Sequence, residues 1–199
     1  RCNPKIIGFC NKKFYNDELI VLTKVKNENE SPLVLFNPAE GNHARGKYNQ
    51  RQIDVLTNEI LPNLNNSSIG IISPFRKQVN KINEEYKNNK EIEVDTVHKY
   101  QGREKNIIIL STVVNDKDDF ADDVNLLNVA VSRAVDKLYV VVSDREKNQN
   151  MKDLVGYIKY YNCDIVESKI YSIFELKKKS YSSHLNKYQQ KYKNVSEHK

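Results

Sequence analysis

The densest group of reactive side chains in the sequence lies between Asp95 and Glu104, in the order Asp-Thr-Val-His-Lys-Tyr-Gln-Gly-Arg-Glu. A β-branched run ends just before this stretch at Val94, and a fully apolar run follows it from Ile107 to Leu110. Uninterrupted apolar runs are typical of strands buried on both faces of a parallel sheet. Such sheets hold their ligands at the rim. We therefore expect this loop, with its hydroxyl, imidazole, amide, carboxylate and cationic groups, to bind a ligand there.

Small polar residues also follow the other apolar runs, namely Ser73, Asp95-Thr96, Ser111 and Ser143-Asp144. The carboxyl ends of parallel strands meet at one edge of a sheet, so we expect these side chains to converge. Hydroxyls and loop amides at such an edge can hold phosphate oxygens. Alternatively, each residue caps the helix that follows it. We favour capping for Ser143 and phosphate contact for Thr96, which stands beside His98.

Arg133 is the candidate for phosphate chemistry. It lies in Leu126-Leu-Asn-Val-Ala-Val-Ser-Arg-Ala134, where small neighbours would let a helix pack closely against a sheet and hold the guanidinium in place. A fixed guanidinium at a cleft between domains stabilises charge on a transferring γ-phosphoryl group. The alternative is a surface arginine in a salt bridge, and spacing alone favours that alternative.

Alternating elements must position these groups. Apolar runs predict strands at 19–22, 33–36, 69–72, 91–94, 107–110 and 138–142. Apolar residues at helical spacing predict helices at 1–15, 49–61, 75–86, 125–134 and 151–161. Strands that alternate with helices over periods of about 30 residues indicate a parallel, doubly wound α/β domain.

Composition excludes several classes of protein. The 199 residues suit about one domain with an appended segment. No apolar run is long enough to cross a membrane, and Cys2, Cys10 and Cys163 lack the spacing of a disulfide framework or a zinc site. We expect no metal site, and we expect the protein to reside in a reducing compartment, the cytoplasm. The net charge of +6 favours a polyanionic partner only modestly. The start, without Met or a signal peptide, resembles a piece of a longer protein.

A stretch with the spacing of a phosphate-binding loop is discounted. Gly41-Asn-His-Ala-Arg-Gly46-Lys47 has the glycine and lysine spacing of a P-loop, but Tyr48 replaces the Ser or Thr that would hold Mg²⁺. No acidic pair ends an apolar strand to complete a metal site. The chain is therefore expected to lack a P-loop of its own, and His43, His184 and His198 are expected to face solvent.

Four segments, taken in order, carry a resemblance to a known family. VDTVHKYQGREKNIIILS resembles motif V of superfamily 1 helicases, and LNVAVSRA resembles their motif VI. IGIISPFRKQ resembles motif IV, and RCNPKIIGFCNKKFYNDEL resembles the segment after motif III. The sequence is most similar to the group that contains the nonsense-mediated-decay helicase, senataxin and the nuclease-helicase of Okazaki-fragment processing. The resemblance covers residues 1–176.

The resemblance implies a RecA-like doubly wound fold of the P-loop NTPase type, with a mainly parallel sheet and helices on both faces. Residues 1–176 would form the second motor domain of an ATP-dependent DNA or RNA helicase. In that family ATP lies between two RecA-like domains, and the first supplies the P-loop lysine and the Mg²⁺ carboxylate. ATP and Mg²⁺ would then be bound mainly by a preceding domain of the same parent chain, and this fragment alone would hydrolyse no ATP.

Roles for individual residues follow from the same resemblance. Arg133 would be the arginine finger, and Arg1 would also reach the γ-phosphate. Glu104 would contact the ribose, and the Gln101-Gly102 turn would face the nucleotide. The residues implied to lie against single-stranded nucleic acid are Ser73, Pro74, Arg76, Thr96 and His98. His98 departs from the acidic residue common in the group, although histidine is familiar there in related helicases.

Two alternatives stay open. A RecA-like module without motor activity, holding nucleic acid or a protein, would share the fold and the charge, but pure binding has no need of the phosphate-sensing Arg133 and Glu104. Residues 177–199 form a Lys-rich tail with Tyr and Leu at heptad-like spacing, and its last residues are expected to be disordered. The tail is either an amphipathic helix docked on a domain or a direct contact with nucleic acid.

Overall fold

The computed structural model describes residues 2–25, 30–38, 46–64, 68–87, 89, 91–113, 118–142 and 147–170. Several sequence predictions lie outside the described residues. They are those for Arg1, for residues 41–45 of the P-loop-like stretch with His43, for Ser143-Asp144, and for the tail with His184 and His198.

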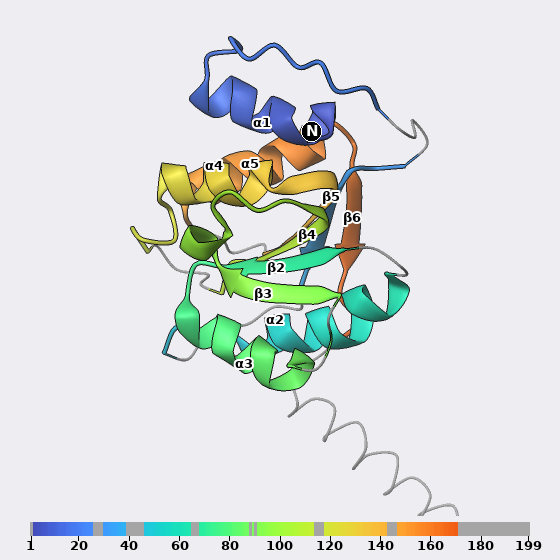
Figure 1. The fold of residues 1–199 in the computed structure, drawn as a ribbon, viewed down its shortest axis with the longest axis vertical. Coiled ribbons are helices and arrows are strands. Elements are labelled where there is room, and N and C mark those ends of the chain that lie inside the picture. The colour runs from blue at the N-terminus through green and yellow to red at the C-terminus, as the bar shows by residue number, and fades with distance from the viewer. Residues whose placement is uncertain are drawn as a thin grey trace, which may run out of the picture.

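A six-stranded sheet forms the centre of the domain, in the order β3-β2-β4-β5-β1-β6 (Figure 1). The strands are β1 (Leu33–Asn37), β2 (Ile69–Ser73), β3 (Ile92–Thr96), β4 (Lys105–Ser111), β5 (Ala134–Val141) and β6 (Asp164–Glu167). Every pair of neighbouring strands is parallel. The predicted parallel α/β fold is therefore confirmed.

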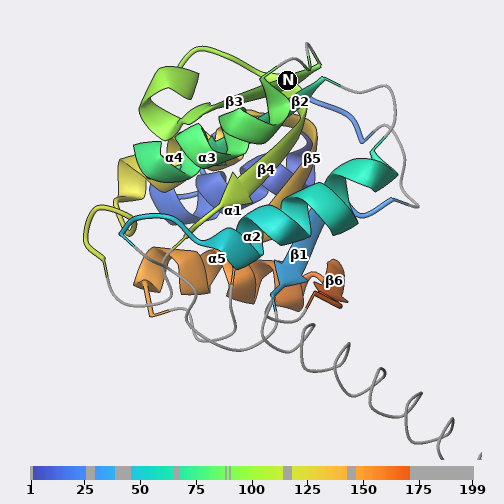
Figure 2. The same cartoon turned by 90° about the horizontal axis from the view of Figure 1, so that it is seen from below.

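Helices cover both faces of this sheet. On one face lie α1 (Pro4–Phe14), α4 (Val124–Ser132) and α5 (Gln149–Tyr160), and on the other lie α2 (Gln50–Val55) and α3 (Arg76–Tyr86) (Figures 1 and 2). After α2 the chain continues through a wide helical turn, η1 (Leu56–Ile60), and a tight one, η2 (Leu61–Asn63). Each face has its own apolar core.

The strand sequences explain the two cores. Side chains alternate between the faces of a strand, so Ile108 and Leu110 of β4 enter the core under α1, α4 and α5. Ile107 and Ile109 enter the core above α2 and α3. Because both faces are covered, the whole run is buried, which is why it contains no polar residue.

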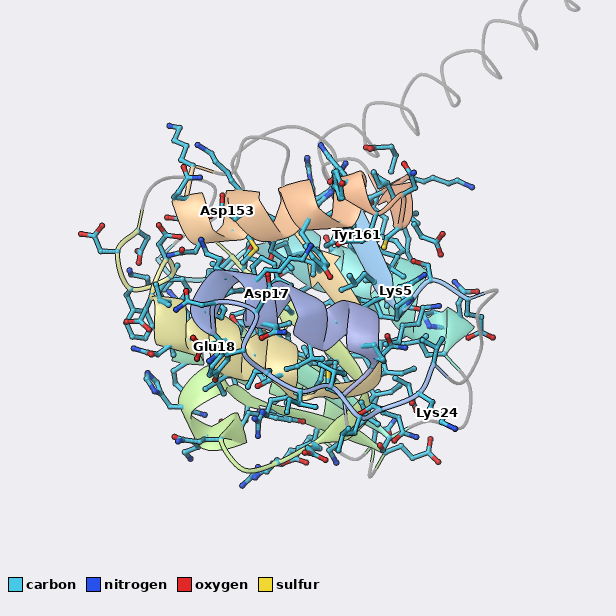
Figure 3. The ribbon with its side chains drawn as sticks, turned by 90° about the horizontal axis from the view of Figure 1, so that it is seen from above. Lys5, Asp17, Glu18, Lys24, Asp153 and Tyr161 are labelled. Carbon is cyan, nitrogen blue, oxygen red and sulfur yellow. The ribbon has the colours of Figure 1, made fainter. Side chains whose placement is uncertain are left out.

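The predicted helix at 1–15 corresponds to α1, which begins only at Pro4, because Pro4 suits the first turn and the Asn3 side chain caps the helix by accepting a hydrogen bond from the Lys5 amide. It is tied to α5 at several points. The rings of Phe9 and Tyr157 lie 5.5 Å apart, and Lys13 pairs with Asp153, which Figure 3 shows on α5.

The predicted strands differ from the observed ones in two places. Residues 19–22, predicted as a strand, are extended but pair with no strand in the described part of the chain. Ile20 and Leu22 are each 86% exposed, and Leu19 is held instead by the Asn11 side chain of α1. Figure 3 shows the course of this segment from Asp17 and Glu18 to Lys24. Conversely, β6 was missed because all four of its residues are exposed, so its sequence carries no apolar run.

Within the described residues, no helix combines the length and the apolar character needed to cross a membrane.

Candidate functional site

Arg133 lies at the amino-terminal edge of the sheet, between the end of α4 and the first residue of β5. Its Nε donates to the Val129 carbonyl at 3.3 Å, and one terminal nitrogen donates to the Ser132 hydroxyl at 3.0 Å. The other terminal nitrogen reaches the Arg103 carbonyl at 3.5 Å. All three acceptors are uncharged, so these bonds fix the guanidinium without cancelling its charge.

The loop Gln101–Glu104 lies beside Arg133 at this edge. All four of its residues are exposed, and the Lys105 amide that follows donates to the Arg133 carbonyl at 3.1 Å. Gly102 has a φ of +83°, a conformation that L side chains rarely adopt, and no heavy atom lies within 4 Å of the place a Cβ would take. Backbone geometry rather than lack of space therefore explains the glycine.

Glu93 holds this loop in place. Its carboxylate pairs with Arg103 and, at 2.9 Å, with Lys105. Partial burial acts to raise the pKa of Glu93, but the hydrogen bonds and charges of Lys105 and Arg103 outweigh it and keep that pKa below its usual value. Glu93 was not predicted as a site residue, although its place on an expected strand next to a cation-rich loop was a usable indication.

Tyr100 anchors the same loop from beneath. It is fully buried, and its hydroxyl donates to the Glu93 carbonyl at 3.1 Å. Space for the ring depends on Gly70 in β2, because a Cβ there would lie 2.5 Å from the Tyr100 hydroxyl and 2.7 Å from Ile108.

The start of α1 lies at the same edge. The Asn3 amide donates to the Val135 carbonyl of β5 at 2.8 Å. Burial raises the pKa of the Cys2 thiol to about 12, and the charges of Glu104 and Arg133 act on the same thiol. Cys2 is therefore near both predicted nucleotide-binding residues, whereas Arg1 itself lies outside the described residues.

The opposite, carboxyl-terminal edge brings together Arg76, Asp95 and Thr96. Thr96 ends β3 in register with Ser73, the last residue of β2. One Arg76 nitrogen pairs with Asp95 at 2.9 Å, and another donates to the Thr96 hydroxyl at 3.2 Å. The Thr96 side chain is buried under this arginine, so a ligand would meet Arg76 first.

Ser73 and Pro74 shape the turn from β2 into α3. Ser73 is fully buried, and its hydroxyl accepts a hydrogen bond from the Phe75 amide at 3.4 Å. Pro74 is half-buried, and His98 is exposed close to Thr96 in sequence. Any contribution of Ser73 to a ligand surface is therefore made through the turn that it stabilises.

The expectation that residues 95–104 form one loop at a single edge of the sheet is wrong, whereas their binding of a ligand stays a prediction. The 3-10 helix η3 (Val97–Tyr100) crosses one face of the sheet between the end of β3 and the start of β4. Two parallel strands can be joined only if the connection returns to the opposite edge. Thr96 and His98 therefore belong to the carboxyl-terminal edge, and Gly102 and Glu104 belong to the amino-terminal edge. Gln101 lies between them, since its amide donates to the His98 carbonyl at 3.4 Å.

A buried amide network at the carboxyl-terminal edge was also missed. Gln52 of α2 accepts from the Ser111 hydroxyl at 2.7 Å and from the Val113 amide at 2.9 Å, and Gln78 of α3 donates to Ser111 at 2.9 Å. Asn49 donates to the Val113 carbonyl at 3.0 Å. The network fixes the end of β4, where Val113 has a strained φ of +73°. Glutamines on the buried faces of two expected helices were the available indication.

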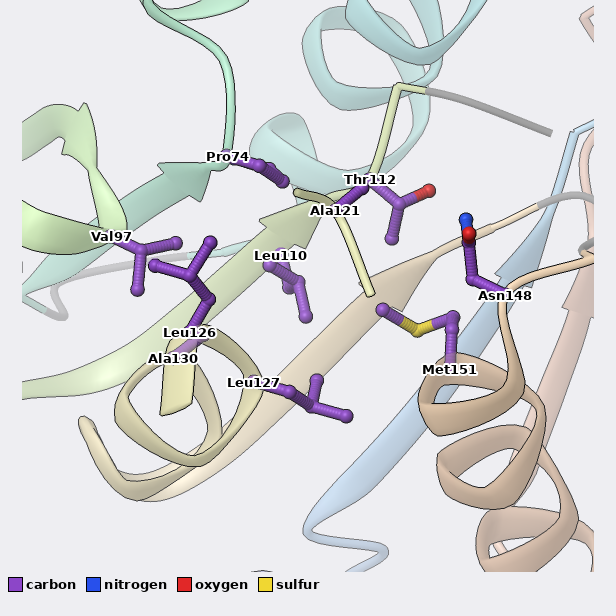
Figure 4. A pocket seen from close by; sticks show the side chains of 10 residues that line it. All are labelled: Pro74, Val97, Leu110, Thr112, Ala121, Leu126, Leu127, Ala130, Asn148 and Met151. Carbon is purple, nitrogen blue, oxygen red and sulfur yellow. The ribbon is translucent and has the colours of Figure 1, made fainter. Parts of the chain in front are cut away.

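A small cavity lies between α4, α5 and the end of β4 (Figure 4). Its lining is mainly apolar, with Thr112 and Asn148 as polar groups, and its volume of about 20 Å³ suits a single water. It is too small for a nucleotide.

At the end of the P-loop-like stretch, Lys47 pairs with Asp118 at 2.7 Å and lies 4.5 Å from the Phe75 ring centre.

Comparison with known families decides the classification of this fold. The family model AAA_12, described as an AAA domain, matches residues 1–145, which is more than half of the chain. The chain belongs to this AAA domain family. The AAA domain is similar to parts of several known helicases, which confirms the resemblance read from its motifs.

Three relatives show how far the similarity extends. The uncharacterized ATP-dependent helicase MJ0104 of Methanocaldococcus jannaschii is 32% identical over 177 residues, which cover 75% of this chain and 26% of that protein. The DNA replication ATP-dependent helicase/nuclease DNA2 of Gallus gallus is 47% identical over 81 residues, covering 38% and 8%. Helicase SEN1 of Saccharomyces cerevisiae is 35% identical over 107 residues, covering 48% and 5%. The chain thus spans about a quarter or less of these relatives.

A solved structure supports the fold of the AAA domain. The C-terminal domain of a possible DNA helicase from Lactobacillus plantarum WCFS1 superposes with a TM-score of 0.50 at 16% identity, covering 77% of this chain and 95% of that one. The RecA-like α/β architecture predicted from the sequence is confirmed by this match and by the parallel sheet.

Proposed function

We propose that this AAA domain is the second motor domain of an ATP-dependent superfamily 1 helicase. The observation that carries the proposal is the placement of Arg133. Its guanidinium is fixed by uncharged acceptors at one edge of the sheet, beside an exposed loop and away from the edge that holds Arg76 and Thr96. Among the described residues this guanidinium forms no ion pair, and a fixed guanidinium of this kind is suited to charge that develops on a phosphoryl group.

The amino-terminal edge fits one side of a nucleotide. Arg133 would contact the γ-phosphate, as would Arg1, and Glu104 with the Gln101-Gly102 turn would contact the ribose and base. Among the described residues there is no group of acidic, histidine or cysteine side chains arranged to hold a metal. ATP and Mg²⁺ would therefore be held mainly by a preceding domain of the same parent chain. When bound, ATP supplies the phosphoryl group whose transfer Arg133 stabilises.

The carboxyl-terminal edge would hold one phosphate or more of a single strand of DNA or RNA. Arg76 is about half exposed and already donates to the Thr96 hydroxyl, so a phosphate oxygen could take a place between the two side chains. His98 would lie along the same strand, while Ser73 and Pro74 would fix the turn that presents Arg76. These contacts are to the backbone of the strand and carry no sequence preference.

Helix η3 would connect the two edges mechanically. It begins directly after Thr96 and ends at Tyr100, directly before the Gln101–Glu104 loop. Its inward side chains, Val97 and Tyr100, are buried against the core that also contains α4, the helix that carries Arg133. A change in the nucleotide contacts at one edge would therefore be transmitted through the four residues of η3 to the nucleic-acid contacts at the other edge.

The first test is ATP turnover by this chain alone and by the full-length protein with and without a single-stranded oligonucleotide. The proposal expects no turnover by the chain alone and oligonucleotide-stimulated turnover by the full-length protein. Turnover by the chain alone that is abolished by Lys47→Ala would restore the P-loop reading. Strand binding without any turnover in the full-length protein would instead favour a binding module without motor activity.

A further inference from the structure

Phe120 has no role in the function proposed so far, yet its ring is unusually placed for so large an apolar side chain. It lies in the segment before α4 and is 46% exposed. Its ring centre lies 5.7 Å from that of Phe75 and 6.0 Å from that of His98. Phe75 is nearly buried, so the exposed ring rests on a fixed apolar support at the carboxyl-terminal edge.

A hollow of about 500 Å³ opens beside this ring. Its apolar lining, besides Phe120, is Val97, Leu126 and Val129, and its polar lining is His98, Gln101, Asp123, Asn125 and Asn128. We call it the Phe120 hollow. A volume of this size lies within the range of small-ligand sites, which combine an apolar surface with a few polar groups.

We propose that the Phe120 hollow receives a nucleobase of the bound single strand, stacked on the Phe120 ring with its edge toward the amides of Asn125 and Asn128. The inference deepens the proposed function and rests on it, because the strand must first lie along the Arg76–Thr96 edge. Every base has a π-face, so aromatic stacking holds a strand without selecting its sequence. Amide side chains both donate and accept, so they suit the edge of any base. The Asn128 amide nitrogen already donates to the Tyr15 hydroxyl at 2.8 Å, which leaves its oxygen and its second hydrogen for the base.

The charges around the hollow agree with this arrangement. Arg76 and Lys99 are exposed on the side of η3 and α3, where the strand backbone would lie. The segment that carries Phe120 contains Asp118, Asp119, Asp122 and Asp123. Asp119 is exposed and would repel phosphates, and the other three are already engaged. Asp118 pairs with Lys47 at 2.7 Å, Asp122 accepts from the Gln149 and Asn150 amides, and Asp123 accepts from the Leu126 amide. The phosphates would therefore pass the arginine side, and an uncharged base would enter the hollow.

The test measures how the full-length protein binds two fluorescent oligomers of equal length, one of deoxythymidine and one with abasic sugars and the same phosphates. Phe120→Leu should weaken binding of the oligodeoxythymidine by about tenfold and leave binding of the abasic oligomer unchanged, because only the stacked base is lost. Phe120→Tyr, which keeps a ring, should retain most of the affinity. Tyr160→Leu is the matched control, since this tyrosine is 76% exposed at the end of α5 and lines no part of the hollow.

Three outcomes would overturn the inference. If Phe120→Leu weakened both oligomers alike, the loss would come from a disturbed edge and not from stacking. If it weakened neither, the hollow would have another occupant, such as a protein side chain. If the unaltered protein bound neither oligomer, the proposed function would fail together with the inference. This outcome is distinguishable from the other two, because it is seen in the unaltered protein and not only in the variants.

Discussion

At the amino-terminal edge Arg133 is bonded to carbonyl and hydroxyl oxygens, whereas at the carboxyl-terminal edge Arg76 is paired with the Asp95 carboxylate. The first guanidinium keeps its full charge for an incoming phosphate. The second must share its charge with Asp95, and an exposed ion pair of this kind is worth little and is readily exchanged. One edge is therefore suited to strong stabilisation of charge, and the other to contacts that can be made and released as a strand moves.

Replacing Arg133 gives the largest effect that this comparison predicts. In the full-length protein, Arg133→Ala should lower kcat for ATP hydrolysis by about 10³-fold or more, with nucleotide affinity nearly unchanged, because the arginine acts on charge in the transition state. Steady-state turnover together with nucleotide binding measures both quantities. Arg133→Lys keeps the charge but loses the planar fork, so it should recover only part of the loss. An unchanged kcat would remove Arg133 from this role.

The packing of η3 against the sheet can be tested at Gly70. Gly70→Ala should lower the free energy of unfolding by about 1–3 kcal/mol, because the added methyl group would overlap the buried Tyr100 hydroxyl and Ile108. Denaturant unfolding measures this loss. In the double variant Gly70→Ala/Tyr100→Phe, removal of the hydroxyl should relieve part of it, so the two effects should not add. Strict additivity would mean that Gly70 and Tyr100 do not share the same space.

The smallest effect is expected at Thr96. Thr96→Val should weaken single-strand binding about fivefold, which corresponds to the loss of one hydrogen bond of roughly 1 kcal/mol. Fluorescence anisotropy with a labelled oligonucleotide measures the change. Thr96→Ser keeps the hydroxyl and should bind like the unaltered protein. Equal weakening by both variants would show that packing beneath Arg76, and not the hydroxyl, is what the strand requires.

Much of the fold could be predicted from the sequence, because strands buried on both faces contain long apolar runs. The Ile107–Leu110 run predicts β4, and apolar residues at helical spacing predict α3. Prediction failed where apolar residues are exposed or where a strand contains few apolar residues. Residues 19–22 are apolar yet exposed, and β6 is a strand without an apolar face.

The candidate site could be predicted as a set of residues but not as an arrangement. The motifs identify Arg133, Glu104 and Thr96. The sequence of a continuous motif does not indicate, however, that η3 separates the motif into two parts that lie at opposite edges of the sheet. That division follows from the parallel pairing of β3, β2 and β4, which is a property of the whole sheet. The Gln52–Ser111 contact was missed because its two residues are 59 positions apart in the sequence. Glu93 was missed although Arg103 is only ten positions away, because the contact depends on how the connection after β3 returns to the amino-terminal edge.

The most direct test of the two-edge account measures oligonucleotide affinity and kcat for ATP in the same two variants of the full-length protein, Arg133→Ala and Thr96→Val. The account predicts that Arg133→Ala lowers kcat and leaves oligonucleotide affinity unchanged. It also predicts that Thr96→Val lowers oligonucleotide affinity and leaves kcat at saturating oligonucleotide nearly unchanged. If both variants changed the same quantity, the two edges would not perform separate tasks and the account would be contradicted.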